Sequence, residues 1–459
     1  MENILIIGGV AAGMSAASRA RRVAPEARVT VLERGPAVSY GACGLPGVLA
    51  GRIQRLEDLV AHPVEFFREQ RGIEVRPGHE ALEIEPGRRR VRARSEAGES
   101  WLSYDRLVIA TGARSRWLPA GPRLRHVYAA NTWDQVAQLR AALESGEIRR
   151  VAVVGAGYIG LEMAEALAQR GGLEVHLIHA NATPLRGFDG DMVAELPARI
   201  AAAGITLHAG CRVRELAGPE GGRLLGVATS SGVIPADALV NCGGLRPETA
   251  LAERAGILLG RSGAIAVDER QQTSVAGIYA AGDCAETRHR VSGAPVWIPL
   301  GAAANHQGRV AGQNAAGRRA ARYPGVMGTL AVPLFGLEFG RTGLGESEAR
   351  AAGMDAAATT VRAATRAAYM RGAPGVPEGE ITLKIVYQPS TRRLLGCQAW
   401  GPAGAVTGQL DVAVTACSAG MKLEDVEHLD LAYSPALAPL YEPLQIAAHN
   451  ALQDTAAST

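Results

Sequence analysis

Short apolar segments that run straight into glycine-rich turns recur along this chain, and they predict parallel α/β units. Residues 4–7 are apolar and lead into a glycine turn at 8–13, a helix with small residues on its packing face, and a second apolar strand at 28–32. The same order of strand, glycine turn, helix and strand returns at 151–179. This pattern favours an α/β protein with two Rossmann-like dinucleotide-binding domains.

The two glycine turns match the dinucleotide fingerprint to different degrees. In the first turn, Gly8 makes the tight bend and Gly13 allows close packing of helix on strand, but Val10 replaces the middle glycine. The second turn, at 155–160, carries all three glycines. Each helix points its N-terminus at a pyrophosphate, and Glu33 can accept hydrogen bonds from ribose hydroxyls. Two fingerprints imply two dinucleotides, of which one is a cofactor and one a substrate.

Two further apolar segments end in small or acidic residues. Residues 107–112 predict a strand that ends in the turn Thr111-Gly112, and residues 273–283 predict a strand that ends in Asp283. In doubly wound sheets, ligands bind beyond the carboxyl ends of the strands. A carboxylate at that edge suits the hydroxyl groups of a ribityl chain.

Composition excludes several classes of protein. Of 459 residues, 47% are apolar and 20% charged, and the formal net charge of +3 is too small to indicate a nucleic-acid partner. The basic run at 88–94 alternates as a half-exposed strand does. Six scattered cysteines without C-x-x-C spacing fit neither a zinc site nor a disulfide framework, so no metal is expected. With no signal peptide and no apolar run of bilayer-spanning length, we expect a cytoplasmic protein without a membrane partner.

Cys43 carries the most specific chemistry of the chain. It lies ten residues beyond Glu33, where a flavin ring lies if the first dinucleotide is FAD, and residues 44–48 contain no second cysteine. One thiol would therefore cycle between thiolate and mixed disulfide, or between thiolate and sulfenic acid. A buried structural cysteine is the alternative.

Together, these motifs resemble the FAD- and NAD(P)-linked disulfide oxidoreductases along the whole chain. The resemblance implies a first FAD-binding segment at 1–113, an inserted NAD(P)-binding domain at 114–243 and a second FAD-binding segment at 244–322. It also implies an α/β dimerisation domain at 323–459, which includes the alternating segment 380–387 and the helical segment 405–421, and hence a homodimer.

The resemblance extends to the residues that bind the cofactors. FAD is expected at Gly8, Val10, Ala11, Gly13, Glu33, Arg34, Thr111, Gly112, Asp283 and Ala303. The hydride donor, NADPH or NADH, is expected at Gly155, Gly157, Tyr158, Ile159, Gly160, Glu162, His179 and Arg186. NADH-specific sites carry a carboxylate where His179 stands, so NADPH should be accepted at least comparably. A partly protonated imidazole at His179 would attract a 2′-phosphate, and Arg186 would add a second cation.

A single redox cysteine excludes the branches of this family that use a C-x4-C pair. NADH oxidases and peroxidases carry a histidine in the first glycine turn, and Ala11 stands there instead. Residues 41–46 and 429–435 resemble the coenzyme A-disulfide and persulfide reductase branch. In that branch, tyrosines matching Tyr369 and Tyr433 reach the active site of the partner subunit. The expected catalytic residues are therefore Cys43, Tyr369 and Tyr433.

The same branch implies a coenzyme A site, made of Ser15, Arg19, Arg22, Ser39, Arg71, Asn305 and Tyr441. Arg22 and Arg71 suit phosphate groups because a guanidinium is a planar fork of donors. Ala42, Gly47 and Leu437 depart from the residues of some members, and Tyr441 replaces a phosphate-binding lysine. These departures leave the identity of the thiol substrate open.

The expected activity is reduction of a low-molecular-weight disulfide or persulfide, with coenzyme A disulfide first, by NAD(P)H through FAD and Cys43. The helix predicted after Cys43 should lower the pKa of its thiol, and the two tyrosines would protonate or steady the departing thiolate. Two alternatives stay open: an NAD(P)H oxidase with a Cys43 sulfenic acid, and a flavin reductase subunit that passes electrons to a protein carrier.

Overall fold

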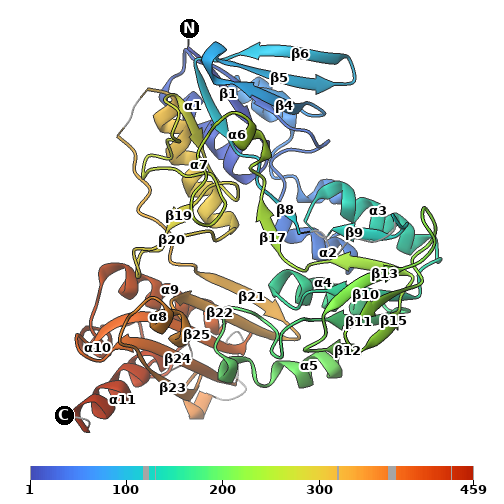
Figure 1. Ribbon diagram of the computed structural model, residues 1–459. Helices are drawn as coiled ribbons and strands as arrows, with labels where there is room; N and C mark the ends of the chain where they lie inside the picture. The colour runs from blue at the N-terminus through green and yellow to red at the C-terminus, as the bar shows by residue number, and fades with distance from the viewer. Residues whose placement is uncertain are drawn as a thin grey trace.

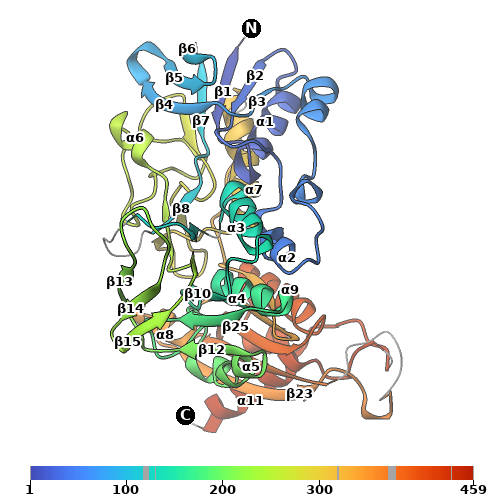
Figure 2. The ribbon, with the colours of Figure 1, turned by 90° about the vertical axis from the view of Figure 1, so that its right-hand side faces the viewer.

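The computed structural model describes residues 2–116, 123–129, 131–317, 320–370, 379–435 and 437–457. Three five-stranded sheets organise the described chain, two of them parallel and one antiparallel (Figure 1). The N-terminus and the C-terminal helix lie at opposite ends of the molecule (Figure 2). This architecture confirms the predicted α/β fold class with two dinucleotide-binding units and a further α/β unit.

The first sheet is parallel and has the strand order β18-β7-β1-β2-β3. Its strands are β1 (Asn3–Ile7), β2 (Arg28–Leu32), β3 (Glu74–Arg76), β7 (Arg106–Ile109) and β18 (Ile278–Ala280). Because β18 comes from late in the chain, this sheet is completed only after the second sheet has been traversed. The segment 273–277, predicted as part of this strand, is instead a turn that closes on Thr273, whose N–H and hydroxyl both donate to the Ile278 carbonyl.

Two helices, α1 (Ala11–Val23) and α7 (Gly301–Ala315), pack side by side against the first sheet. Their approach is close because small residues face each other. A Cβ atom at Gly308 would overlap the backbone of Ala12, and one at Gly312 would overlap the backbone of Ala16. The small-residue face predicted for the first helix therefore packs against a second helix from late in the chain.

The second sheet is also parallel, with the order β12-β11-β10-β16-β9. Its strands are β9 (Val127–Ala129), β10 (Arg150–Val154), β11 (Glu174–Ile178), β12 (Ile205–His208) and β16 (Ala238–Asn241). Its helices are α3 (Trp133–Glu144), α4 (Tyr158–Arg170) and α5 (Leu196–Ala202). The chain enters and leaves this unit through an antiparallel pair, β8 (Ala113–Ser115) and β17 (Leu245–Pro247).

The third sheet is antiparallel, with the order β21-β22-β25-β24-β23. Its strands are β21 (Leu330–Leu334), β22 (Leu337–Gly343), β23 (Ala357–Ala364), β24 (Glu380–Gln388) and β25 (Arg393–Pro402). Around it lie α8 (Glu346–Ala351), α9 (Val406–Ala419), α10 (Leu423–Glu427) and α11 (Pro443–Ala457). The strand and the helix predicted for this region correspond to β24 and α9.

Smaller elements decorate the two parallel units. They are the meander β4 (Glu80–Glu85), β5 (Arg90–Ser95) and β6 (Gly98–Ser103), the meander β13 (Val213–Ala217), β14 (Gly226–Thr229) and β15 (Gly232–Pro235), the pair β19 (Thr287–Arg288) and β20 (Pro295–Val296), and α6 (Ala250–Arg254). In β5 the basic run pairs with acids of β4, for example Arg90 with Glu85 at 2.8 Å and Arg94 with Glu80 at 2.6 Å. The basic run is therefore a solvated hairpin face.

A short helix links the first unit to the second. Helix α2 (Leu45–Leu49) buries Leu45, Val48 and Leu49 in the same apolar cluster as Leu139 of α3 and Leu161 of α4. Each fully buried aliphatic side chain contributes roughly 1.5–3 kcal/mol. The segment around Cys43 is thus anchored in the core of the second unit, although it follows a strand of the first.

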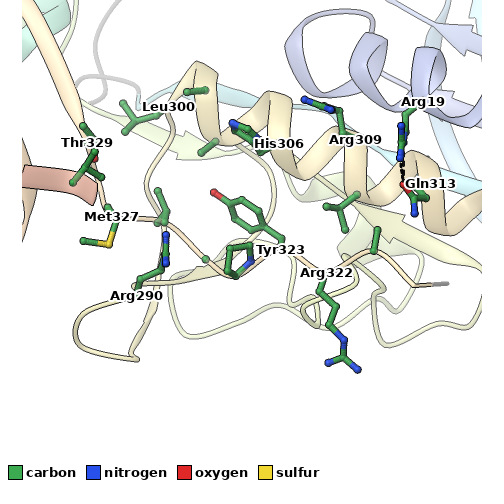
Figure 3. A pocket seen from close by; sticks show the side chains of 18 residues that line it. Arg19, Arg290, Leu300, His306, Arg309, Gln313, Arg322, Tyr323, Met327 and Thr329 are labelled. Atoms are coloured by element: carbon green, nitrogen blue, oxygen red, sulfur yellow. Dashed lines mark hydrogen bonds between the residues drawn. The ribbon is translucent and has the colours of Figure 1, made fainter. Parts of the chain in front are cut away.

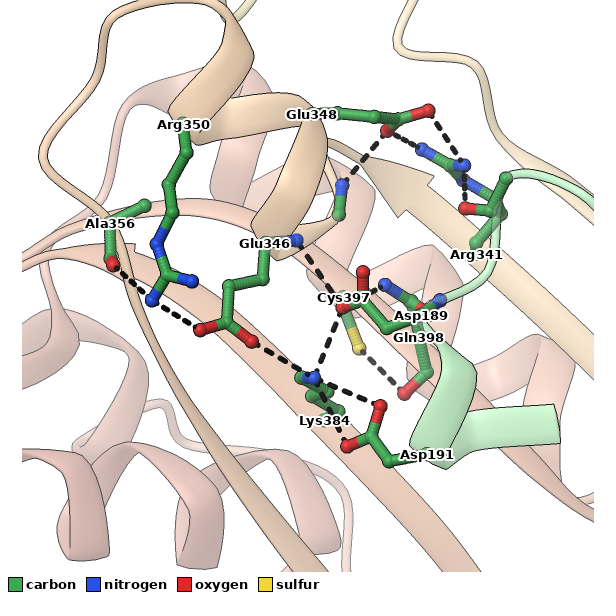
Figure 4. Close-up of polar contacts among 12 residues, drawn as sticks. Asp189, Asp191, Arg341, Glu346, Glu348, Arg350, Ala356, Lys384, Cys397 and Gln398 are labelled. Carbon is green, nitrogen blue, oxygen red and sulfur yellow. Dashed lines mark hydrogen bonds and ion pairs between the residues drawn. The ribbon is translucent and has the colours of Figure 1, made fainter. Parts of the chain in front are cut away.

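The second unit is also held to the third sheet, by a buried lysine. Lys384 of β24 is 6% exposed, and its ammonium group lies 3.1 Å from Asp189, 3.0 Å from Asp191 and 3.2 Å from Glu346 (Figure 4). The two aspartates come from the second unit, and the glutamate begins α8. Gln398 adds to the same contact, because its side-chain amide donates to Asp189 at 2.8 Å.

None of the helices in the described part of the chain combines the length and the apolar character needed to cross a bilayer.

We predict that Lys384→Met destabilises the contact between the second unit and the third sheet. The substitution leaves three carboxylates without their shared cation, and breaking a buried ion pair typically costs about 3–5 kcal/mol. Thermal unfolding followed by circular dichroism should show a midpoint several degrees lower. Lys422→Met is the matched control, because Lys422 is the other lysine of the chain and is exposed. An equal loss in both variants would contradict this role of Lys384.

Candidate active site

The first glycine turn lies at the carboxyl end of β1 and has little free space. Gly8 has φ +109°, a conformation that favours glycine, and a Cβ atom there would overlap the carbonyl oxygen of Ala110. A Cβ atom at Gly13 would overlap the carbonyl oxygen of Gly8. Val10 has an ordinary negative φ and precedes α1, so the turn tolerates a side chain at the middle position. Ala11 begins the helix.

Glu33 is oriented by the same turn. Its carboxylate accepts hydrogen bonds from the backbone N–H groups of Gly9 and Gly35, both at 2.7 Å. Arg34, the next residue, is exposed. These two bonds fix the carboxylate beside the glycine turn and leave further lone pairs for ribose hydroxyls.

Late segments of the chain complete this edge of the sheet. The hydroxyl of Thr111 donates to the Glu248 carbonyl at 2.6 Å, and Gly112 follows with φ +73°. A Cβ atom at Gly282 would lie 2.7 Å from the Ala12 side chain, so the turn that carries Asp283 lies against the start of α1. Ala303 is buried in the first turn of α7.

Asp283 is a half-buried carboxylic acid whose side chain has no hydrogen-bond partner among the described residues. Burial raises its pKa to about 6, and within the described chain its side chain accepts no hydrogen bond. Hydroxyl groups of a ligand would supply those bonds. The glycine turn, Glu33 and Asp283 therefore fit FAD as a group that presents a pyrophosphate, a ribose and a ribityl chain to one sheet edge.

Two further residues orient this edge, although the sequence analysis did not single them out. Gln307 is 3% exposed, and its side-chain oxygen accepts a hydrogen bond from the Gly282 N–H at 2.7 Å. The indole N–H of Trp297 donates to the Asp283 carbonyl at 2.7 Å. The signal for Gln307 was a long polar side chain on an otherwise small and apolar helix face.

The second glycine turn repeats the geometry of the first. Gly155 has φ +101°, and a Cβ atom at Gly160 would overlap its carbonyl oxygen. Around Gly157 there is open space, which a pyrophosphate requires. Tyr158 and Ile159 follow in the first turn of α4 and are partly buried.

His179 differs from the expectation of a partly protonated imidazole. It is 8% exposed, its Nδ1 accepts from the Ala156 N–H at 3.2 Å, and its Nε2–H donates to the Thr183 carbonyl at 3.0 Å. Burial lowers its pKa despite the bond to Thr183, so the ring is neutral. The attraction of a 2′-phosphate by His179 is therefore wrong, and Arg186, whose side chain is exposed, is the cation left in this loop.

Cys43 lies in a short 3₁₀ turn, η1 (Ala42–Gly44), directly before α2. The loop that leads to it is tied to the first glycine turn, because the Ser39 N–H donates to the Gly9 carbonyl at 2.8 Å. Ser39 itself has φ +52°. Of the six cysteines, all in the described chain, Cys43 alone is exposed. The alternative of a buried structural cysteine is therefore wrong.

The pKa of Cys43 also differs from the expectation. It is raised, first by burial of the thiolate among surrounding protein atoms and then by the carboxylates of Glu162 and Asp283. The predicted helix start after Cys43 is present, but α2 has only five residues, and its partial charge does not outweigh desolvation and two acids.

Side chains from two other parts of the chain lie near Cys43, Tyr158 and Glu162 from α4 and Asp283 from the turn after β18. Glu162 lies one turn after Tyr158 on α4, and burial together with Glu165 raises the pKa of Glu162 to about 7. Burial, followed by the charges of Asp283, Cys43 and Glu162, raises the pKa of Tyr158 to about 12. The tyrosine hydroxyl lies 3.4 Å from the Pro299 carbonyl, just before α7. The thiol therefore stands where the edges of both parallel sheets meet.

The two tyrosines predicted to be catalytic lie together on the third unit. Their hydroxyl groups are 3.5 Å apart, and the side chains are exposed, at 73% for Tyr369 and 45% for Tyr433. Among the described residues, no hydrogen bond joins either tyrosine to Cys43 of the same chain. Tyr441, also on this unit, is 68% exposed.

Most of the predicted substrate residues lie on or beside α1. The Ser15 hydroxyl bonds to the Asn305 side chain of α7, and Nε of Arg19 donates to Gln313 at 2.9 Å. Arg22 is exposed near the end of α1. The guanidinium of Arg71 lies 5.2 Å from the ring centre of Phe66. The backbone carbonyl of Arg71 accepts a hydrogen bond from Nε of Arg21 at 3.1 Å. The structure thus groups Ser15, Arg19 and Asn305 along two adjacent helices.

Within the described chain, no cluster of three or more histidine, cysteine or acidic side chains could hold a metal ion.

Comparisons with known proteins agree with this geometry. Residues 2–308 match the model of the pyridine nucleotide-disulphide oxidoreductases, and residues 330–442 match the dimerisation domain of that family. The NAD(P)H coenzyme A polysulfide/persulfide reductase of Pyrococcus horikoshii is 37% identical, over 97% of this chain and 98% of the relative. An NADH oxidase of Methanocaldococcus jannaschii is 30% identical, over 98% of each chain. The structure of an NAD-dependent persulfide reductase from A. fulgidus superposes with a TM-score of 0.91 at 34% identity, over 99% of this chain and 84% of that one.

We predict that NADPH and NADH are used with comparable efficiency, and that Arg186 supports NADPH. No carboxylate stands at the end of β11 to repel a 2′-phosphate, and the exposed guanidinium can bind one. Arg186→Gln should lower kcat/KM for NADPH about tenfold and leave NADH unchanged.

The control is Arg214→Gln, which removes an exposed arginine from β13 of the same unit. An efficiency for NADH more than about a hundredfold above that for NADPH in the unmodified enzyme would contradict this reading.

Proposed function

The chain belongs to the pyridine nucleotide-disulphide oxidoreductase family, and from this we propose that it uses NAD(P)H to reduce a coenzyme A disulfide or persulfide through Cys43. The observation that carries the proposal is the exposed thiol of Cys43, at the meeting of two dinucleotide-binding edges and without a second cysteine beside it. Because Cys43 has no second protein thiol beside it, the disulfide that it forms during the reaction would be with a sulfur of the substrate.

The protein's part of the reaction is thiol–disulfide exchange at one sulfur. The Cys43 thiolate attacks one sulfur of the substrate disulfide, so that a bond forms to Sγ while the substrate S–S bond breaks and one thiol departs as a thiolate. The product on the enzyme is a mixed disulfide. Its reduction by two electrons returns Cys43 to the thiolate and releases the second thiol.

The cofactors would be held by the two glycine turns. FAD would lie on the first turn with Glu33 and Asp283 on its hydroxyl groups, and NAD(P)H on the turn that ends at Gly160. When bound, FAD would supply electron transfer from the nicotinamide to the mixed disulfide on Cys43. Tyr158 and Glu162 line the approach between the two turns, and Glu162, with a pKa of about 7, can exchange a proton near neutral pH.

An active unit of two chains follows from the dimerisation domain and the exposed tyrosines. Tyr369 and Tyr433 have phenol groups that can donate a proton to a departing thiolate. We propose that each pair serves Cys43 of the partner subunit, since their mutual contact leaves both side chains open to a second chain.

An NAD(P)H oxidase is the second candidate, since an NADH oxidase is among the relatives. Oxygen or peroxide chemistry at a cysteine sulfenic acid needs a proton donor beside it, and the first glycine turn offers Ala11 instead of a histidine. The disulfide or persulfide reductase is therefore the stronger reading.

We predict that Cys43→Ser abolishes NAD(P)H-dependent reduction of coenzyme A disulfide while FAD stays bound. A serine hydroxyl cannot form the mixed disulfide, and loss of a nucleophile typically lowers kcat by at least about a thousandfold. Turnover would be followed by NAD(P)H absorbance and flavin content by its visible spectrum. Cys417→Ser, in α9, is the control.

Mass spectrometry of the non-reduced enzyme completes this test. Coenzyme A attached to Cys43 would support the proposal, and a sulfenic acid with fast oxygen consumption would favour the oxidase. Retained turnover in Cys43→Ser would contradict a redox role for this thiol and favour transfer of electrons to a protein carrier.

We predict that Tyr433 acts across the dimer. Tyr433→Phe should lower disulfide turnover about tenfold without loss of FAD, because the proton donor is removed and the ring is kept. A heterodimer of one Cys43→Ser chain and one Tyr433→Phe chain should regain about half of the activity of the unmodified dimer, since one of its two symmetric sites is intact. A heterodimer with only about half of the activity of the Tyr433→Phe enzyme, about one twentieth of that of the unmodified dimer, would show that the tyrosine acts within its own chain.

A further inference from the structure

The loop 185–191 joins the second unit to the third sheet. It lies between β11 and α5, and it carries Arg186, the cation expected beside the 2′-phosphate of NADPH. The Arg186 side chain is exposed, and it makes no hydrogen bond or ion pair within the described chain. Such a side chain is aimed by its backbone, so the groups that hold the loop decide where Arg186 points.

The N-terminal side of Arg186 is fixed to the second glycine turn. The Leu185 N–H donates to the Ala156 carbonyl at 2.7 Å, and the Leu185 side chain is 2% exposed. Leu185 also has φ +56°, a left-handed conformation that a residue with a side chain keeps only where its surroundings hold it. Arg186 therefore starts from a fixed point beside the turn that faces the pyrophosphate.

The C-terminal side of Arg186 is fixed to the third sheet instead. The guanidinium of Arg341, in β22, donates to the Gly187 carbonyl. Gln398 of β25 binds Asp189 at two points. The Asp189 N–H donates to the side-chain oxygen of Gln398 at 2.8 Å, and the side-chain amide donates to the Asp189 carboxylate at 2.8 Å. Arg341 is 8% exposed and Gln398 is fully buried, so both anchors belong to the core of the contact.

An aromatic pair closes the gap between these two anchors. The ring of Phe188 lies edge-on to that of Phe339 in β22, with the ring centres 6.4 Å apart and the planes at 82°. Edge-to-face pairs add stability beyond the area that they bury. Residues 187, 188 and 189 are thus each held by a different side chain of the third sheet.

The acids that follow Arg186 are paired with a cation of the third sheet. The Lys384 ammonium lies 3.1 Å from Asp189 and 3.0 Å from Asp191 (Figure 4). A free carboxylate three or five residues from Arg186 would repel a phosphate. Because Lys384 pairs both acids, Arg186 is the unpaired charged side chain of the described segment 180–191.

We propose that Arg341 and Gln398 are positioning residues for the hydride donor, which hold the loop 185–191 so that Arg186 meets the 2′-phosphate of NADPH. The inference rests on the proposed function, because it needs NAD(P)H on the second glycine turn. Both residues act through the loop backbone and not by contact with the nucleotide. A cation that is already in place loses less conformational freedom when the phosphate binds, so the same contact gives a higher affinity. NADH has no 2′-phosphate and gains nothing from this arrangement.

The test follows anaerobic reduction of the flavin in the holoenzyme by NADPH and by NADH. The dependence of the rate on nucleotide concentration gives a Kd for each nucleotide without any disulfide substrate. Gln398→Met removes both bonds to Asp189. Arg341→Lys keeps the positive charge but loses the planar fork that reaches Gly187. Each variant should raise the Kd of NADPH at least about fivefold and that of NADH less than about twofold.

Gln409→Met is the matched control. Gln409 of α9 also binds a carboxylate and a backbone N–H, those of Glu442 and Leu444, but both lie within the third unit. This variant should leave both Kd values unchanged. In an Arg186→Gln background, Gln398→Met should raise the Kd of NADPH by less than about twofold, because the cation that it positions is already absent.

The outcomes separate a positioning role from a structural one. Equal loss of NADPH and NADH affinity in the two variants would overturn the proposal. Unchanged NADPH binding in Arg186→Gln, or an effect of Gln398→Met that is as large without Arg186 as with it, would also overturn it. If Gln398→Met loses its FAD or its circular dichroism spectrum, the same cycle with Arg341→Lys decides. If these Kd values change as expected but no coenzyme A disulfide is reduced, the proposed function fails while the positioning role stands.

Discussion

The packing of α2 into the core of the second unit is the contact on which the active site depends. Leu45, Val48 and Leu49 bury their side chains against α3 and α4, and the residue two positions before this helix is Cys43. At the other side, the Ser39 N–H binds the Gly9 carbonyl of the first glycine turn. A loop held at both ends has little freedom, so the thiol stays between the two dinucleotide edges. The buried Lys384 cluster extends this bracing to the third sheet.

Charge distinguishes two regions of the molecule, an acidic one around Cys43 and a basic one along α7. Around Cys43 lie the acids Glu162 and Asp283, and burial raises the pKa of both, to about 7 and about 6. Because these two buried acids are partly protonated near neutral pH, the Cys43 thiol exchanges its proton without a large negative charge beside it. Along α7, by contrast, a cavity is lined by four arginines and by no acidic residue of the described chain (Figure 3).

Several properties of the site were beyond prediction from sequence because they depend on neighbours from elsewhere in the chain. The place of His179 directly after β11 was predicted correctly, yet burial by the surrounding chain lowers its pKa, and the Ala156 N–H donates to its Nδ1. The helix start after Cys43 was also predicted, yet burial and two distant carboxylates outweigh it and raise the thiol pKa. Thr273 was predicted to lie in a strand because the residues that follow it are mostly apolar. Instead, its N–H and its hydroxyl both donate to the Ile278 carbonyl and close a turn.

The sequence alone determined the fold class, the two glycine turns and the importance of Cys43, because these are local: a turn at Gly8 or Gly155 needs φ values that glycine favours, and apolar strands alternate with helices at fixed spacing. Tertiary structure decided which of these pieces share a site. It joined β18 to β7, set Asp283 beside α1, brought the hydroxyls of Tyr369 and Tyr433 within 3.5 Å, and gathered arginines from α1, α7 and two loops around one cavity. Such groups are separated by up to hundreds of residues, and only packing of the intervening core brings them within reach of each other's charges.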